Sequence, residues 1–342
     1  MVVEGRGGRC LRRGLGGLPG LVLAGALGAM PGAAGGQTVT EFALPIAGSA
    51  PIDIVTGPDG SVWFTEQHGD RIGRISRCGE LAEFDVPTPR SFPRGITFGP
   101  DGSLWFTELI GKIGRITPAG AITEYPIPGG ISEPVEIAAD PSGNRWFTEY
   151  YNRIGRITPA GLVSLFPVPT PSSSPRFITA GPDASLWFTE FDGNRIGHIT
   201  TAGAITELVL PALTGPLGIA SGPDGNIWFT ELSANRIGRL TTSGQLTEFP
   251  IPTGASGPSA IVSGPDGNLW FTETSANQVA RITPDGVVME IPVPTPASSP
   301  YGIARGPDGS IWFTEFTADK VARIHFHRTP PCPRNVGFRG PP

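Results

Sequence analysis

The stretch GPDGSLWFTE, residues 99–108, recurs with small changes until the chain ends. Its tryptophan returns every 41 or 42 residues, and the copies account for all seven tryptophans of the chain: Trp63, Trp105, Trp146, Trp187, Trp228, Trp270 and Trp312. A repeat of about 40 to 45 residues is typical of a β-propeller, in which each copy forms one four-stranded blade around a central axis. The sequence therefore predicts seven blades.

One repeat, taken over residues 93–128, contains four short segments separated by turns. PRGITF and SLWFTE flank the turn GPDG, and KIGRIT and AITEYPIP flank the turn TPAG. Proline at the second position of Gly-Pro-Asp-Gly and glycine at its end are typical of a type I turn. The segments are rich in Trp, Phe, Ile and Thr, and no sustained helical periodicity occurs outside the first 36 residues. The chain is therefore expected to be all-β.

The residues that recur in every copy are predicted to be structural. A ligand-stacking tryptophan would occur once, whereas a tryptophan in every blade is expected to pack between neighbouring sheets. Each WFTE motif ends in a glutamate, and a basic residue follows four or five positions later, except in the sixth copy, where Gln278 stands. We expect these glutamates to form cross-strand ion pairs with those bases. The glutamates are Glu66, Glu108, Glu149, Glu190, Glu231, Glu273 and Glu315.

The two ends of the chain differ in composition from the repeats. Residues 1–36 begin with arginines and continue as a Gly/Ala/Leu-rich run, a pattern typical of a secretory signal peptide. That run is too short and too glycine-rich to favour a membrane span. Residues 37–328 form the predicted propeller, and residues 329–342 a proline-rich tail. The mature protein is therefore expected to be secreted or periplasmic, and monomeric.

The charge of the chain restricts its partners. The formal net charge of −5 becomes −8 when the four arginines and one glutamate of the leader are removed. Nucleic-acid binding usually requires a basic stripe, so this acidic balance argues against it and favours a small molecule or a protein. No CxxC, HExxH, EF-hand or P-loop spacing occurs, and the sequence assigns no metal ligands.

The N-terminal segment of the mature chain is expected to close the ring. Residues 38–46, TVTEFALPI, match the fourth segment of a repeat, which the last repeat lacks. If this segment completes the seventh blade, the ring has no open edge. Two cysteines remain beyond the leader, Cys78 after the third strand of blade one and Cys332 after that of blade seven. In an exported protein a disulfide between them is one expectation, and two separate thiols are the alternative.

Function is expected where the repeats differ on one face. The first strand of each blade starts at a proline, and the residues after these prolines should surround the central axis: Ile52, Arg94, Val135, Arg176, Leu217, Ser259 and Tyr301. The next positions add Asp53, Glu136 and Phe177, and hairpin loops of the same face add His68, Tyr150, Tyr151, Phe191 and Phe316. We name this the channel face.

Six residues of the channel face are the predicted ligand-binding set: Asp53, Arg94, Glu136, Arg176, Phe177 and Tyr301. Arginines, carboxylates and aromatic rings around one axis suit a polar ligand with flat groups. The alternative is that Arg94 pairs with Asp53 or Glu136 and merely fills the axis. Both interpretations stay open at this point.

The repeat motifs carry a resemblance to a known family. WFTE, NRIGRIT (residues 152–158), TEFPIP (residues 247–252) and SPYGI (residues 299–303) resemble the virginiamycin B lyase, or streptogramin lyase, family over residues 38 to about 326. The resemblance implies a seven-bladed propeller. The founding members of that family linearise streptogramin B antibiotics by a Mg²⁺-dependent elimination at the ester bond, without water. A carbon–oxygen lyase activity, Mg²⁺ and a role in antibiotic resistance are what the resemblance implies here.

The catalytic positions of that family hold other residues in this chain. Ser259 follows the proline of blade six, where the family has histidine; Ser299, Pro300 and Tyr301 stand in place of Glu-Pro-His; and Ile52 stands in place of a tyrosine. Abstracting a carbon-bound proton needs a base that titrates near the working pH, which histidine does best. His68 is the histidine expected to reach the channel face, either as a catalytic residue or as a solvated loop residue.

Three functions are consistent with these features. The leading hypothesis is a secreted propeller that binds a ligand or protein on its channel face without the lyase chemistry. The second is a carbon–oxygen lyase with a rearranged site, built from His68, Arg94, Glu136, Arg176 and Tyr301. The third is a structural or sensor propeller. The fold alone does not choose among them, because propellers carry many functions.

Overall fold

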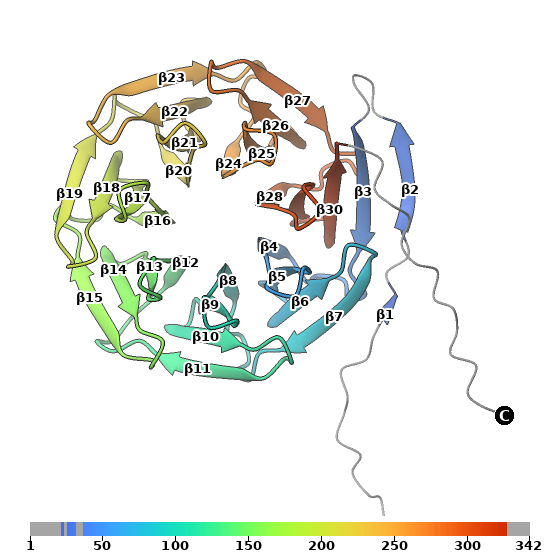
Figure 1. Cartoon of the computed structure of the whole chain (residues 1–342), viewed down its shortest axis with the longest axis horizontal. Coiled ribbons are helices and arrows are strands. Elements are labelled where there is room, and N and C mark those ends of the chain that lie inside the picture. The colour runs from blue at the N-terminus through green and yellow to red at the C-terminus, as the bar shows by residue number, and fades with distance from the viewer. Residues whose placement is uncertain (1–21, 24–25, 32–36, 327–342) are drawn as a thin grey trace, which may run out of the picture.

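The computed structural model describes residues 22–23, 26–31 and 37–326. These residues form seven antiparallel sheets arranged in a ring (Figure 1), and no helix occurs among them. In five of the sheets the strands bond side by side in chain order from the central axis to the rim, and the other two sheets also contain strands from the N-terminal segment. The all-β, seven-bladed prediction is confirmed. No helix within the described part of the chain is long and apolar enough to cross a membrane.

The blades follow one another along the chain. Blade 1 consists of β4 (Pro51–Thr56), β5 (Val62–Glu66), β6 (Arg71–Ile75) and β7 (Glu80–Asp85). Blade 2 consists of β8 (Pro93–Phe98), β9 (Leu104–Glu108), β10 (Lys112–Ile116) and β11 (Ile122–Pro126). Blade 3 consists of β12 (Pro134–Ala139), β13 (Arg145–Glu149), β14 (Arg153–Ile157) and β15 (Val163–Pro167). Blade 4 consists of β16 (Pro175–Ala180), β17 (Leu186–Glu190), β18 (Arg195–Ile199) and β19 (Ile205–Val209).

The last three blades complete the circle. Blade 5 consists of β20 (Pro216–Ser221), β21 (Ile227–Glu231), β22 (Arg236–Leu240) and β23 (Leu246–Pro250). Blade 6 consists of β24 (Pro258–Ser263), β25 (Leu269–Glu273), β26 (Gln278–Ile282) and β27 (Val288–Pro292). Blade 7 consists of β28 (Pro300–Arg305), β29 (Ile311–Glu315) and β30 (Lys320–His325), and its fourth strand is the N-terminal β3 (Thr38–Ala43).

The hydrophobic core lies between neighbouring blades, as blade 2 shows. Trp105 is fully buried and stacks on Tyr125 of the outermost strand, with ring centroids 5.5 Å apart. The next residue, Phe106, lies against Gly114, where an added Cβ would come within 2.1 Å of the ring. Glycine is therefore required at that position by close packing. The predicted core role of the repeated tryptophan is confirmed, since every copy is buried.

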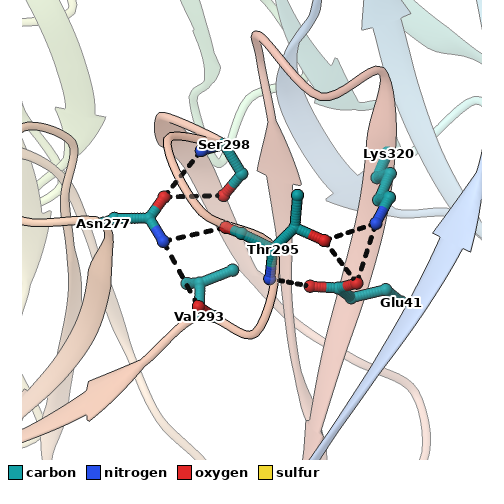
Figure 2. A network of polar contacts seen from close by, with 6 residues as sticks. All are labelled: Glu41, Asn277, Val293, Thr295, Ser298 and Lys320. Carbon is teal, nitrogen blue, oxygen red and sulfur yellow. Dashed lines mark hydrogen bonds and ion pairs between the residues drawn. The ribbon is translucent and has the colours of Figure 1, made fainter. Parts of the chain in front are cut away.

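The N-terminal strand closes the ring as expected. β3 pairs antiparallel with β30 from Thr38↔His325 to Ala43↔Lys320. Glu41 accepts hydrogen bonds from the backbone N–H and the hydroxyl of Thr295, at 2.9 and 2.8 Å, and Lys320 Nζ lies 2.9 Å from its carboxylate (Figure 2). In blade 2, Glu124 binds Thr88 and Lys112 in the same way. Glu41 thus occupies the place of an outer-strand residue.

Two short strands fall within the predicted leader. β1 (Val22–Leu23) pairs with β7, and β2 (Ala26–Pro31) pairs with β3, so both lie at the rim of the ring. Each adds a fifth strand to a blade that already has four. Loss of residues 1–36 would therefore leave seven four-stranded blades, and the assignment of this segment as a signal peptide stays a prediction.

The predicted pairing of the WFTE glutamates is only partly right. Arg71 Nε lies 3.2 Å from Glu66, and Arg153 forms an ion pair with Glu149. In blades 2, 4, 5 and 7 the prediction is wrong, because the base pairs instead with the glutamate of the outermost strand: Glu124, Glu207, Glu248 and Glu41. The outer glutamates are more exposed, so binding the cation there costs less desolvation. The WFTE glutamates of these blades are buried without such a partner.

Candidate functional site

The channel face is defined by the register of the inner strands. Each inner strand begins at a proline that lies opposite the glutamate closing the second strand, as in Pro51↔Glu66. The starts of the inner strands and the hairpins after the WFTE motifs therefore share one face, as expected. A register shift follows the proline in every blade, between Pro51 and Ile54 in blade 1. This bulge is where the repeats carry their variable residues, Asp53 among them.

Asp53 and Glu136 form a carboxyl pair across blades 1 and 3. Their side chains are hydrogen-bonded to each other. Ile96 N–H donates to Asp53 at 2.7 Å, and Ile137 N–H donates to Glu136 at 3.1 Å. Burial raises the pKa of Asp53 to about 6. Burial, and then the charge of Asp53, raise the pKa of Glu136 well above its usual range. Two buried carboxyls in contact interact strongly, so they titrate as a coupled pair.

Arg94, Tyr301 and Phe177 connect blades 2, 7 and 4 across the axis. Arg94 Nη2 donates to the hydroxyl of Tyr301 at 3.2 Å. The rings of Tyr301 and Phe177 lie 6.5 Å apart between centroids. Arg94 also lies near the carboxyl pair, where its charge lowers the pKa of Asp53 and of Glu136. Five of the six predicted ligand-binding residues are therefore brought together around the axis.

Arg176, the sixth, lies on aromatic rings. Its guanidinium carbon is 4.8 Å from the ring centroid of Tyr150 and 5.6 Å from that of Phe191. Its Nε is buried and has no hydrogen-bond acceptor. Within residues 37–326, neither Arg176 nor Arg94 has a carboxylate within 4 Å. The alternative in which Arg94 forms a close ion pair with Asp53 or Glu136 is therefore not what the structure shows.

The family's catalytic positions are occupied by residues with structural contacts. Ile52 is buried, and its carbonyl accepts the hydroxyl of Thr314 at 3.0 Å. Ser259 is buried with its hydroxyl 2.8 Å from that of Thr274. Ser299 accepts a hydrogen bond from Thr317 at 3.2 Å. None of these three side chains is a base that titrates near neutral pH.

His68 lies apart from the carboxyl pair. Its ring is exposed and packs edge-on between Phe316 and Phe92, with centroids 5.8 and 6.4 Å away. Its position on the channel face agrees with the expectation, but no contact joins it to Asp53 or Glu136. Phe92 was missed by the sequence reasoning. It directly precedes the proline of blade 2 and is 37% exposed, so its place before that proline was the available signal.

The other histidines and the cysteines are placed as follows. His198 lies on β18 and His325 at the end of β30, whereas His327 lies outside the described residues. Cys78 is disulfide-bonded. Its predicted partner Cys332 lies outside the described residues, so the pairing itself stays a prediction.

The described residues form no preassembled cluster of side-chain ligands for the Mg²⁺ that the family resemblance implies. Mg²⁺ requires oxygen ligands in near-ideal octahedral geometry and is usually bound through one or two carboxylates, waters and substrate groups. No group of three or more His, Cys, Asp or Glu residues in the described part of the chain is arranged to hold a metal ion. The Asp53 and Glu136 carboxyls are hydrogen-bonded to each other and to backbone N–H groups. The described residues therefore assign no role to a bound metal ion.

Comparison with known proteins places the chain in a family. The model described as the virginiamycin B lyase family matches residues 33–177 and 151–329. A streptogramin B lyase structure is 40% identical with a TM-score of 0.82, over 84% of this chain and 97% of that one. Selenomethionine-substituted virginiamycin B lyase from Staphylococcus aureus is 41% identical with a TM-score of 0.81, over 84% and 99%.

A catalytically inactive variant of the Staphylococcus aureus lyase, determined with quinupristin, gives similar values. It is 40% identical with a TM-score of 0.81, over 84% of this chain and 99% of that one. No curated protein sequence matches the chain. The match of the family model to nearly the whole propeller, together with this level of identity, means that the chain belongs to the virginiamycin B lyase family.

Proposed function

We propose that this protein is an exported binding propeller that captures a small ligand with an anionic group and a flat ring on its channel face, without the lyase chemistry of its relatives. The observation that carries the proposal is that Arg94 and Arg176 have no anionic partner in the described chain. Both lie on the channel face among aromatic rings, and neither has a carboxylate within 4 Å in the described chain.

The arrangement around Arg176 suits such a ligand. The guanidinium carbon lies within 4.8 Å of the Tyr150 ring centroid and 5.6 Å of that of Phe191, and a guanidinium on aromatic rings keeps its N–H donors for an anion. A carboxylate accepts two parallel hydrogen bonds from this geometry. Because Tyr150 is 38% exposed, a ligand's ring can stack beside the cation at low cost. Tyr301 and Phe177 extend the aromatic surface toward Arg94.

A carbon–oxygen lyase with a rearranged site is the second candidate, and one observation favours it. Asp53 has a pKa raised to about 6, is hydrogen-bonded to Glu136, and lies near Arg94. A carboxylate with such a pKa can act as a general base near neutral pH. The pair is enclosed by backbone donors and joins two blades, which favours a structural role over proton transfer to a bulky substrate.

The test of the binding proposal uses naphthoate as an anionic flat probe and naphthamide as its neutral isostere. Isothermal titration should show that naphthoate binds at least about 10-fold more tightly than naphthamide, because two unpaired arginines receive its carboxylate. The double variant Arg94→Gln, Arg176→Gln should lose this preference. The control Arg236→Gln removes an exposed arginine from the hairpin of blade 5 and should keep it. Equal affinity for both probes in the parent protein would refute the proposal.

The lyase alternative is separated by a turnover experiment. Quinupristin is incubated with the protein and Mg²⁺, and the products are separated and weighed by mass spectrometry. Ring opening by elimination gives a linear product of unchanged mass, whereas hydrolysis adds a water. We expect neither product. Linearisation that is lost in Asp53→Asn would overturn the binding proposal and establish the rearranged lyase site.

Export and the disulfide are tested by one intact-mass measurement. When the full chain is expressed in a bacterial host with a secretion pathway, the exported protein should begin near residue 37, because residues 1–36 resemble a signal peptide. Its mass should rise by two hydrogens on reduction if Cys78 and Cys332 are joined. A protein that keeps residue 1 would disprove removal of the leader, and an unchanged mass on reduction would disprove the disulfide.

A further inference from the structure

Six of the seven blades fill the same position near the rim with an arginine. The guanidinium of a third-strand arginine lies 5.0 to 5.9 Å from the ring centroid of the blade's tryptophan, through Arg74, Arg115, Arg156, Arg239, Arg281 and Arg323. Four of these arginines form an ion pair of 2.9 to 3.5 Å with an aspartate of the first turn: Asp59, Asp101, Asp266 and Asp308.

The arginines also reach the neighbouring blade. Four of them donate to a backbone carbonyl at the second position of that blade's outer turn, namely Pro118, Thr201, Pro284 and Arg77. The repeated position is therefore a guanidinium site with three components. These are an indole face, an aspartate of the same blade and a turn of the next blade.

Blade 4 departs from this pattern at two residues of adjacent strands that lie on the same side of the sheet. His198 stands where the other blades have arginine, opposite Trp187 in the ladder. Leu208 stands where Phe84, Tyr125, Phe166 and Phe249 stack on the tryptophans of their blades. Both replacements are shorter. Blade 6 also has an aliphatic residue there, Ile291, but it keeps Arg281, and Phe326 packs on Trp270 at 5.1 Å.

The two replacements together open a cavity. Its volume is about 350 Å³, and it lies between blades 4 and 5, lined by Asp183, Trp187, His198, Leu208, Thr242 and Gly244 among others. Trp187 is 7% exposed, whereas the other six tryptophans are fully buried. His198 packs edge-on against Trp187, with ring centroids 4.6 Å apart, and the cavity borders the part of the indole that this shorter side chain leaves uncovered.

The remaining components of the guanidinium site are still present in blade 4. Asp183 accepts the indole N–H of Trp187 at 3.2 Å, and its other oxygen lies 3.0 Å from His198 Nε2. One third of the Asp183 side chain remains exposed. Thr242 holds the second position of the blade 5 turn, which supplies a carbonyl in the equivalent turns. Glu207 also lines the cavity, but its carboxylate is bound by Thr170.

We propose that this cavity binds a guanidinium group, from a small molecule or from an arginine side chain of a peptide, in the position that the protein's own arginines occupy in the other six blades. The guanidinium would lie on Trp187 and pair with Asp183. The site lies near the rim, between blades 4 and 5, and is independent of the function proposed for the channel face.

The experiment follows the indole N–H signals of the ¹⁵N-labelled protein by NMR. The Trp187 signal is assigned with Trp187→Phe, and methylguanidinium is titrated at pH 8, above the range in which histidine usually titrates. Because Asp183 accepts the Trp187 N–H, ligand binding should shift that signal saturably, with a dissociation constant on the order of millimolar, while the other six signals stay in place. Urea, a neutral molecule of the same shape, should bind at least about 10-fold more weakly.

Two designed variants provide matched controls. His198→Arg with Leu208→Phe restores the arrangement of the other blades and should abolish the shift. Arg239→His with Phe249→Leu copies blade 4 into blade 5 and should make Trp228 respond. A blocked Gly-Arg-Gly peptide distinguishes the sources: a shift with the peptide indicates an arginine side chain, and a shift with methylguanidinium alone indicates a small molecule. Equal responses to urea and methylguanidinium, or no response of Trp187 in the parent protein, would overturn the proposal.

Discussion

The free energy of unfolding is expected to fall by at least about 5 kcal/mol as the pH rises from 5 to 9. The cause is the set of WFTE glutamates that the fold buries without a full counter-charge. Burial raises the pKa of Glu66 and Glu190 from 4.5 to about 7. It raises the pKa of the corresponding glutamates in blades 2, 5, 6 and 7 to about 8, namely Glu108, Glu231, Glu273 and Glu315.

The sign follows from proton binding. Between pH 4.5 and 8 the folded state keeps protons on these carboxyls that the unfolded state releases, so raising the pH favours unfolding. Below pH 4.5 both states are protonated and the effect vanishes. The aspartates that accept the tryptophan N–H groups behave oppositely: hydrogen bonds from Trp228 and Asn226 hold the pKa of Asp224 below 3.8. Their contribution is lost as the pH falls below about 4, and stability should be highest between about pH 4 and 5.

Glu273 isolates this effect, because Gln278 stands where other blades have a base. Glu273→Gln should raise the free energy of unfolding by about 1–3 kcal/mol at pH 9 and change it little at pH 5, since glutamine mimics the protonated acid. The matched control is Glu149→Gln in blade 3, where the carboxylate binds Arg153 and Ser132. That change should destabilise by about 1–3 kcal/mol at both pH values.

Urea denaturation of the parent and both variants, followed by tryptophan fluorescence at pH 5, 7 and 9, measures these differences. The control matters because general repulsion within an acidic protein also grows with pH, and both variants reduce the net charge equally. If the two substitutions stabilise the protein alike at pH 9, repulsion alone explains the pH dependence. The buried glutamates would then be ionised in the folded state.

Phe42→Ala is expected to destabilise the protein by about 3–5 kcal/mol. Phe42 lies on β3, is almost fully buried, and stacks on Trp312 with ring centroids 5.5 Å apart and planes 16° apart. β3 is bonded to blade 7 without a direct chain connection to it, so its packing holds the first and last blades together. Weakening that packing should let β3 detach before the rest of the ring unfolds.

Hydrogen exchange measured by mass spectrometry tests this order of events. In Phe42→Ala, peptides of β3 and β30 should exchange faster by a larger factor than peptides elsewhere. The comparison is Phe249→Ala, which removes an equivalent stack on Trp228, 5.6 Å between centroids, from a blade whose strands follow one another in the chain. A uniform change across all blades in Phe42→Ala would show that β3 does not open separately and that ring closure is not the weak point.

The sequence by itself determined the architecture, because a propeller repeats one local unit. The 41- or 42-residue spacing of tryptophan specified seven blades, and GPDG and TPAG turns between short apolar segments specified hairpins that pair with their neighbours. The match of TVTEFALPI to a fourth strand placed β3 beside β30. The channel-face residues also followed from position, because the proline before each inner strand marks the same point in every blade.

Only the tertiary structure decided which side chains meet. Contacts across the axis, such as Asp53 with Glu136 and Arg94 with Tyr301, join blades whose separation depends on the radius of the ring and on the bulge after each proline. The cavity of blade 4 was equally hidden. The sequence shows His198 in place of the repeated arginine. The cavity forms only because Leu208 lies on the same side of the sheet, which the sequence alone does not show.

The ion-pair partner of the Lys or Arg that follows a WFTE motif was also decided by the tertiary structure. Spacing along the hairpin placed Lys112 beside Glu108, whereas the fold also brings Glu124 within 2.9 Å from the next strand. The more exposed carboxylate keeps its charge at lower desolvation cost and binds the cation. A repeat therefore specifies which strands pair, and burial in the assembled ring specifies which of two neighbouring glutamates is charged.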